Sequence, residues 1–483
     1  MTDQQIDYGR KWYVMAGVAM GIFLSTIDGS IVNVALPTLV QELRAPFAIV
    51  EWVVLAYLLT LATLLLSMGR LGDMVGKKPV YVAGFIGFTA GSVLCGLAPS
   101  VHWLILFRVL QAIGGAMILA LGMAIVTEAF PPAERGRALG LSGAIVSIGI
   151  VVGPTLGGLI LDVASWHWIF FVNLPVGIAG TLMVLRFVPA GRPAGHQRFD
   201  LPGAITLFAA LLTALLGMTV GQRLGFDDPR ALILFAGSLV LMAAFIVLEN
   251  RSRQPMLDLR LFRNAMFSIS LVSGLMTFIS LGGTMILIPF FLQGVLGYEP
   301  RQVGLLMATI PVTVGMVAPF SGALSDRVGT RPIAVVGLAV VMLGFYSLST
   351  ISTGLSTFGY VLRFVPVGLG LGLFQSPNNS AVLGAVPRQR LGVASGLLSI
   401  TRIVGQTTGI AVLSAVWTGQ VLAYAGSLPA EGAHAAPAPA QVAGLQDIFR
   451  LIVGLIGFAL VLSVWGLIRE RRIGLRVARA RED

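Results

Sequence analysis

The chain has 483 residues, of which 56% are apolar and 11% are charged, and its mean hydropathy is +0.90. A soluble domain carries roughly 25% charged residues, so this composition excludes an ordinary water-soluble enzyme, a nucleic-acid binder and a disordered scaffold. The net charge is +11. In a membrane protein, the distribution of the positive residues among the loops is more informative than this total.

The first apolar stretch, residues 12–36, is longer than the roughly 7–15-residue apolar core of a secretory signal. No small-residue cleavage site follows it, so we expect a first membrane-spanning helix and not a removable leader. A spanning helix needs about 20 mostly apolar residues. Fourteen stretches meet this measure: 12–36, 50–68, 79–98, 103–127, 138–161, 168–188, 201–221, 231–249, 265–292, 303–324, 332–350, 357–383, 393–417 and 448–468.

The positive residues predict the orientation of these spans. An even number of spans places both termini on one side of the membrane. The loops on that side hold 24 Arg and Lys residues, the opposite loops hold 5, and Arg108, Arg363 and Arg402 lie within spans. Cytoplasmic loops carry the excess of Lys and Arg. We therefore expect a multi-pass protein of the cell (inner or cytoplasmic) membrane with both termini in the cytoplasm and the Arg-rich tail near the acidic leaflet.

Two parts of the chain repeat each other. Residues 69–79 read GRLGDMVGKKP and residues 322–332 read GALSDRVGTRP, at an offset of 253. A second set of Pro and Gly residues recurs between 131–153 and 387–409 at an offset of 256. Duplicated halves around a central pathway are typical of secondary transporters. We expect an all-α fold of two six-helix bundles, residues 1–200 and 251–483, with two inserted membrane helices at 201–250.

Four segments resemble the major facilitator superfamily. GRLGDMVGKK is similar to its loop between the second and third helices, and GIVVGPTLGG (149–158) to the fifth-helix signature of its proton-coupled antiporters. STIDGSIVNVALP (25–37) and WHWIFFVNLPVG (166–177) resemble motifs of the fourteen-helix drug:proton antiporter branch. This resemblance implies a monomeric exporter of lipophilic, often cationic compounds, driven by inward proton flow. Its implied partners are small lipophilic substrates, protons and membrane lipid.

Asp28 is the main candidate for the coupling site. An ionisable residue inside a span is costly and is a functional hypothesis by default, and burial favours the protonated form of a carboxylate. Its alternative role is that of a permanent structural partner of Arg108, which enters from the same side at a similar depth. The resemblance associates this fourth-helix arginine with proton coupling. Asn33, a polar residue in apolar surroundings, completes the predicted proton and substrate set.

The other polar residues within or beside the spans are candidates for a substrate cavity. Aromatic walls suit organic cations, whereas most such residues simply pack. The helix around Arg402 contains no acid, which argues against dicationic cargo, and we expect neutral or monocationic substrates. The cavity candidates are Trp52, Tyr57, Gln375, Asn378, Arg402 and Gln406.

Two further sets are expected to control gating. Asp73 and Asp326 lie near helix ends, where the helix dipole stabilises an acid, and the set is Gly69, Asp73, Gly76, Lys77, Asp326 and Arg327. The small residues of the fifth span predict close helix packing, and the resemblance implies a seal against proton leak. They are Gly149, Gly153, Pro154, Gly157 and Gly158.

The sequence contains no motif for another energy source or for catalysis. No Walker loop, HExxH or GxSxG is present, and the single cysteine, Cys95, supports neither a disulfide nor a cysteine-based metal site. We expect no enzyme activity, no cofactor, no metal and no nucleic-acid partner. Three alternatives remain: an exporter of a lipid, fatty acid or specific antibiotic or metabolite, a proton-independent facilitator, and a membrane sensor or enzyme that reuses the fold.

Overall fold

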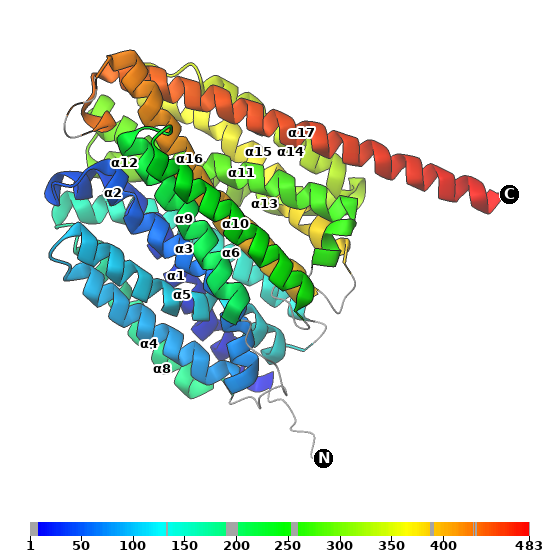
Figure 1. Cartoon of the computed structure of the whole chain (residues 1–483). Coiled ribbons are helices and arrows are strands. Elements are labelled where there is room, and N and C mark those ends of the chain that lie inside the picture. The colour runs from blue at the N-terminus through cyan, green and yellow to red at the C-terminus, as the bar shows by residue number, and fades with distance from the viewer. Residues whose placement is uncertain are drawn as a thin grey trace. The chain divides into compact units, whose positions relative to one another are not determined.

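The computed structural model describes residues 8–131, 134–189, 201–252, 259–386, 391–427, 429 and 432–482. Across these residues the regular secondary structure is helical, with no strand (Figure 1). Helices satisfy every backbone hydrogen bond within their own segment, which lipid surroundings require. The all-α fold expected from the hydropathy pattern is thus confirmed for the described residues.

The chain divides into two units. Unit 1 comprises Met1–Met256 with Gly297–Leu305, and unit 2 comprises Leu257–Leu296 with Leu306–Asp483. The helices of unit 1 are η1 (Tyr8–Arg10), α1 (Lys11–Glu42), α2 (Phe47–Val50), α3 (Trp52–Val75), α4 (Lys77–Gly96), α5 (Val101–Ala129), α6 (Arg135–Val163), α7 (Trp168–Phe171), α8 (Asn173–Phe187), α9 (Leu201–Leu224) and α10 (Pro229–Arg251).

Unit 2 is also a helical bundle. Helix α12 (Pro300–Met307) begins in the segment Gly297–Leu305 of unit 1 and ends in unit 2. Its remaining helices are η3 (Leu259–Arg263), α11 (Ala265–Phe290), the π-helical turn η4 (Phe291–Val295), α13 (Thr309–Val328), α14 (Thr330–Leu348), α15 (Thr357–Gly384), α16 (Leu391–Ala425), η6 (Ala433–Ala435) and α17 (Ala438–Glu482).

Thirteen helical stretches of the described residues are long and apolar enough to cross a membrane. They coincide with thirteen of the fourteen predicted spans. The remaining prediction, 138–161, lies in α6, where the apolar part among the described residues, Ile148–Val163, is shorter. A total of fourteen spans and the cytoplasmic side of the termini therefore stay predictions.

The sequence repeat is matched by a repeat in packing. In unit 1, α1 packs on α6, α4 on α5 and α3 on α5; in unit 2, α11 packs on α16, α14 on α15 and α13 on α15. The loops are equivalent too, because Gly76 has φ 109° and its counterpart Gly329 has φ 98°. Glycine enters this region at no steric cost. The same helix arrangement therefore occurs once in each unit.

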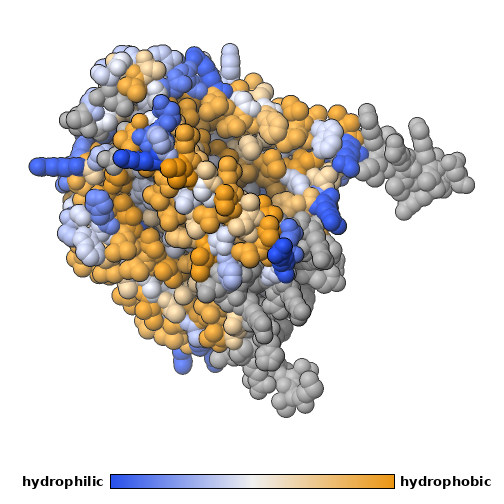
Figure 2. All heavy atoms as spheres, viewed as in Figure 1, coloured by the Kyte–Doolittle hydropathy of each residue, from blue (hydrophilic) through white to orange (hydrophobic). Residues whose placement is uncertain are grey.

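The inserted helices α9 and α10 form an antiparallel pair within unit 1 (Figure 1). Helix α9 packs on α3, whereas α10 exposes apolar side chains, among them Ile233, Leu239 and Val240. Much of the face drawn in Figure 2 is apolar in the same way. Such a surface suits lipid contact. The boundaries predicted for the inserted pair, 201–250, stay a prediction.

The long connection between α16 and α17 differs from its prediction. Its Ala- and Pro-rich centre, residues 427–441, reads as extended or mobile chain. The described residues instead form the turn η6 and the first turn of α17. The Gln441 amide donates to the carbonyls of His434 and Ala436, at 2.9 and 2.7 Å. This side chain closes the turn, which composition alone does not reveal.

Candidate functional site

A buried ion pair lies inside unit 1. Nη1 of Arg108 on α5 is 2.6 Å from Oδ2 of Asp28 on α1, and both side chains are 0% exposed. The guanidinium also donates from Nε to the carbonyl of Val53 at 2.9 Å and lies over the Tyr57 ring at 4.1 Å. Helix α3 supplies these last two contacts, so three helices hold the pair.

Neutral side chains complete the shell around the carboxylate. Oδ1 of Asp28 accepts from Nε2 of Gln111 at 2.8 Å and from Nδ2 of Asn173 at 3.0 Å. Both amides also donate to Oγ of Ser92, at 2.6 and 3.3 Å. Oε1 of Gln111 accepts from Nη1 of Arg108 at 2.6 Å. The carboxylate is thus surrounded by donors from α5 and α8.

Both oxygens of Asp28 face hydrogen-bond donors. A carboxylate accepts at both oxygens, whereas a protonated carboxyl would present a donor to other donors. Breaking a buried pair by neutralising one partner leaves the other charge uncompensated, at a cost of roughly 3–5 kcal/mol. Asp28 and Arg108 therefore depend on each other for charge compensation inside the bundle. The pair and its shell join α1, α3, α5 and α8.

The structure brings Asp28 and Arg108 together and leaves Asn33 outside their network. Nδ2 of Asn33 donates at 3.4 Å to the carbonyl of Gly29 on its own helix. Gln111, Asn173 and Ser92 were missed by sequence reasoning. Gln111 lies one turn after Arg108, and Asn173 lies within WHWIFFVNLPVG. Both are amide side chains inside apolar spans, and this pattern could have identified them as candidates.

The two aromatic candidates of α3 are packed. Tyr57 is 1% exposed and lies under Arg108. Trp52 is 7% exposed, and its Nε1 donates to Oγ1 of Thr219 on α9 at 2.8 Å. Within the described residues Oη of Tyr57 and Nη2 of Arg108 have no hydrogen-bond partner. Trp52 therefore ties the inserted helices to the helix that supports Arg108.

The glycines of α6 form the surface on which α1 packs. A β-carbon at Gly149 would meet the Thr26 side chain, and one at Gly153 would lie 3.1 Å from the Ile27 carbonyl. Pro154, Gly157 and Gly158 are buried in the same helix, with Gly157 on Ile31 of α1. The close packing predicted for this set is present in the structure. Their function as a proton seal stays a prediction.

The predicted gating residues lie near the junctions of α3 with α4 and of α13 with α14, and Gly69, Asp73, Asp326 and Arg327 belong to the last turns of α3 and α13. Gly76 ends α3, and Lys77 forms an ion pair with Glu128 of α5. A β-carbon at Gly69 would have no contact within 4 Å, and Arg327 is exposed. The side chains of Asp73 and Asp326 lie outside the described residues. The gating role of this set stays a prediction.

The polar candidates of unit 2 lie on α15 and α16. Asn378 is 5% exposed, and Gln375, Arg402 and Gln406 are partly buried. Their role in a cavity stays a prediction, and Arg402 is considered further below.

The thirteen apolar helices of the described residues, two units of equivalent packing and charged side chains buried inside a bundle define the class of a multi-pass membrane transporter. The sequence profile of the Major Facilitator Superfamily matches residues 18–410, and the chain belongs to this family. It is accordingly a transporter and not an enzyme.

Two relatives and one solved structure illustrate the similarity. The riboflavin transporter RibZ of Clostridioides difficile is 33% identical over 86% of this chain and 90% of its own. The multidrug transporter protein MdtP of Bacillus subtilis is 31% identical over 91% of this chain and 82% of its own. A bacterial homologue of the human lysosomal transporter Spinster shares the fold, with a TM-score of 0.66 at 17% identity, over 96% and 98% of the two chains.

Proposed function

We propose that this transporter is a proton-coupled antiporter that exports small lipophilic compounds, monocations among them, by alternating access. The proton site is Asp28. The observation that carries the proposal is the fully buried Asp28–Arg108 pair with its shell of neutral donors. The similarity to MdtP, a multidrug transporter protein, supports this choice of cargo.

The coupling step follows from the geometry. When Asp28 takes up a proton, its attraction for Arg108 falls and the guanidinium turns to other acceptors, such as the Val53 carbonyl it already contacts. Release of the proton restores the pair. One proton moving down 100 mV supplies about 2.3 kcal/mol, and one pH unit adds about 1.4 kcal/mol. Together they support a few-hundred-fold gradient of a neutral compound.

The remaining features have proposed roles around this step. The loop residues Gly69, Asp73, Gly76 and Lys77, with Asp326 and Arg327, control closure on the cytoplasmic side, and the α6 glycines prevent proton leak. The protein works as a monomer in the cytoplasmic membrane, with both termini inside, powered by the proton gradient and without a cofactor or nucleic acid.

The test is substrate-induced proton flux in proteoliposomes loaded with a pH dye. A panel of lipophilic monocations, dications, neutral compounds and acids is added to the wild type, to Asp28→Asn and to Asp162→Asn. Asp162 is an exposed carboxylate of the same unit. Flux is expected in the wild type and in Asp162→Asn and is lost in Asp28→Asn. Transport without proton movement, or normal coupling in Asp28→Asn, refutes the mechanism and favours a facilitator.

A second candidate is a dedicated metabolite exporter. The similarity to RibZ, a riboflavin transporter, favours it. It predicts flux with a single member of a metabolite panel that includes riboflavin, and none with the lipophilic monocations. The same vesicles therefore separate the two functions.

A further inference from the structure

An arginine of unit 2 differs from its neighbours in having no partner among the residues that the structure describes. Arg331 pairs with Glu470 at 2.6 Å, Arg450 pairs with Asp447 at 2.7 Å, and Arg363 donates to the carbonyl of Gly359 at 3.1 Å. Arg402 of α16 has neither a hydrogen bond nor an ion pair within the described part of the chain. It lies 11 residues after the start of α16, or about 16 Å along the helix.

The sequence also offers Arg402 no acid in the spans of its own unit. The segments 265–292, 303–324, 332–350, 357–383, 393–417 and 448–468 contain neither Asp nor Glu. An unpaired charge at membrane depth is costly, and ionisable residues in such positions mark substrate or ion pathways. The positive charge of Arg402 therefore needs a compensating group that this unit does not contain.

Asn378 on the neighbouring helix α15 is a second polar side chain without a hydrogen bond among the described residues. A β-carbon at Gly405, one turn after Arg402, would lie 3.1 Å from the Leu275 carbonyl on α11. A β-carbon at Gly274 would lie 3.4 Å from Nδ2 of Asn378 on α15. The backbone of α16 one turn after Arg402 and the Asn378 amide of α15 therefore approach the same turn of α11. Asn378 is 5% exposed and makes no hydrogen bond within the described residues.

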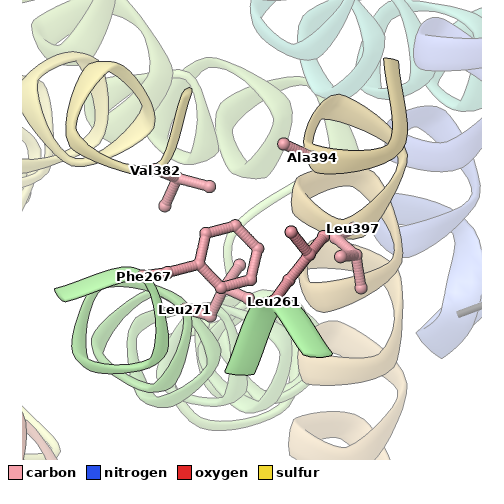
Figure 3. Close-up of a cluster of buried hydrophobic side chains, with 6 residues drawn as sticks. All are labelled: Leu261, Phe267, Leu271, Val382, Ala394 and Leu397. Carbon is pink, nitrogen blue, oxygen red and sulfur yellow. The ribbon is translucent and has the colours of Figure 1, made fainter. Parts of the chain in front are cut away.

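One turn nearer the start of α11, the same three helices enclose an apolar cluster (Figure 3). The Phe267 ring lies among side chains of all three helices, together with Leu261 of η3. The cluster members on the helices that carry Arg402 and Asn378 are Leu397 and Val382, which lie 5 and 4 residues away from them along the chain. Arg402 and Asn378 thus lie about one turn along their helices from a buried apolar cluster. The cluster consists of Leu261, Phe267, Leu271, Val382, Ala394 and Leu397.

We propose that Arg402, together with Asn378, binds the anionic group of a lipophilic acid, whose apolar body lies among the apolar side chains of the surrounding helices. A guanidinium donates two parallel hydrogen bonds to a carboxylate, and the Asn378 amide supplies a further donor. This inference rests on the proposed export of lipophilic compounds and narrows it to those with an acidic group. The inferred cargo is then an acid and not a cation, because the carboxylate of Asp28, which could bind a cation, is already paired with Arg108.

The test compares binding of 2-naphthoate with binding of its methyl ester, which has the same apolar body and no charge. Both are measured as tritiated ligands on purified full-length protein, with protein-free micelles as background. The wild type is expected to bind the acid about tenfold more tightly than the ester, the effect of one charge-assisted hydrogen-bonded pair. Arg402→Gln reduces this ratio to about one, and Arg402→Lys retains part of it. Asn378→Leu lowers it by a smaller factor.

Arg363→Gln is the matched control, because this arginine of α15 already has acceptors. It is expected to keep the wild-type ratio. Equal binding of acid and ester by the wild type, or an unchanged ratio in Arg402→Gln, overturns the inference. The wild-type comparison needs no variant, so it decides even when Arg402→Gln does not fold. A retained acid preference without proton flux refutes the proposed function alone, whereas flux without acid preference refutes this site alone.

Discussion

At the scale of single residues, the partners of a buried charge determine what it does. Arg108 and Arg402 both lie inside predicted spans. Arg108 has an acid, an amide, a carbonyl and an aromatic ring around it, whereas Arg402 has none of the first three within the described residues. This difference fits the roles proposed above, coupling for Arg108 and binding of an external group for Arg402. Residue type alone does not distinguish them.

Asn173 provides a stability test of the Asp28 network. Asn173→Leu removes one donor from a fully buried carboxylate, so the free energy of unfolding is expected to fall by about 1–3 kcal/mol. Asn33→Leu is the contrast, because Oδ1 of Asn33 is buried without a hydrogen-bond partner. This second change is expected to be neutral or stabilising. Unfolding in mixed detergent micelles measures both, and equal effects of the two changes contradict the network.

At the scale of elements, the start of α3 joins the inserted helices to the ion pair. Trp52 donates to Thr219 of α9, the next residue, Val53, accepts from Arg108, and Tyr57 lies under the same guanidinium. A short stretch of helix thus carries three contacts of different kinds. The pair α9–α10 is consequently a support for α3 as well as a lipid-facing surface.

Thr219→Val tests this support while preserving side-chain volume. Loss of the hydroxyl leaves Nε1 of the buried Trp52 without its acceptor, so the free energy of unfolding is expected to fall by about 1 kcal/mol or more. Thr213→Val is the matched control, since the Thr213 hydroxyl bonds only to carbonyls of its own helix, Ala209 and Ala210. Thr219→Ser, which keeps the hydroxyl, should restore stability. Indistinguishable Thr219→Val and Thr213→Val proteins would exclude a supporting bond.

At the scale of the whole molecule, duplication accounts for the two units. The offset of 253 that relates the two loops also relates two glycines with positive φ, Gly76 and Gly329. Helix pairs match between the units, while the charged groups do not. Unit 1 contains the buried pair of Asp28 with Arg108, and the spans of unit 2 contain no acid. Duplication has preserved the scaffold and let the chemistry of the halves diverge.

The charge distribution predicts the orientation of the whole chain. A fluorescent protein fused to the C-terminus should fluoresce, because that end is expected in the cytoplasm, where such fusions fold. Alkaline phosphatase inserted after Gly426, between α16 and α17, should be active, because it requires the opposite side. The reverse pair of results contradicts the predicted topology. It would also mean that the 24-to-5 distribution of positive residues does not set the orientation.

Much of the architecture was predictable from the sequence because it depends on local properties. Hydropathy located the spans that the structure describes as apolar helices, and the loop motifs revealed the duplication. A turn that is closed by a side chain was not predictable in this way. The Ala- and Pro-rich centre before α17 looked extended, whereas Gln441 folds it into a turn by reaching back to His434 and Ala436. That bond depends on the path of the backbone, which composition does not specify.

The sequence by itself determined that the protein is a duplicated, multi-span helical transporter, because the free energy of placing apolar segments in lipid is nearly additive along the chain. It also singled out Asp28 and Arg108. Only the tertiary structure decided that these residues, 80 positions apart, form one pair with Gln111 and Asn173, and that Arg402 has no partner within the described residues. Hydrogen bonds between side chains of different helices depend on packing geometry, which no local pattern encodes.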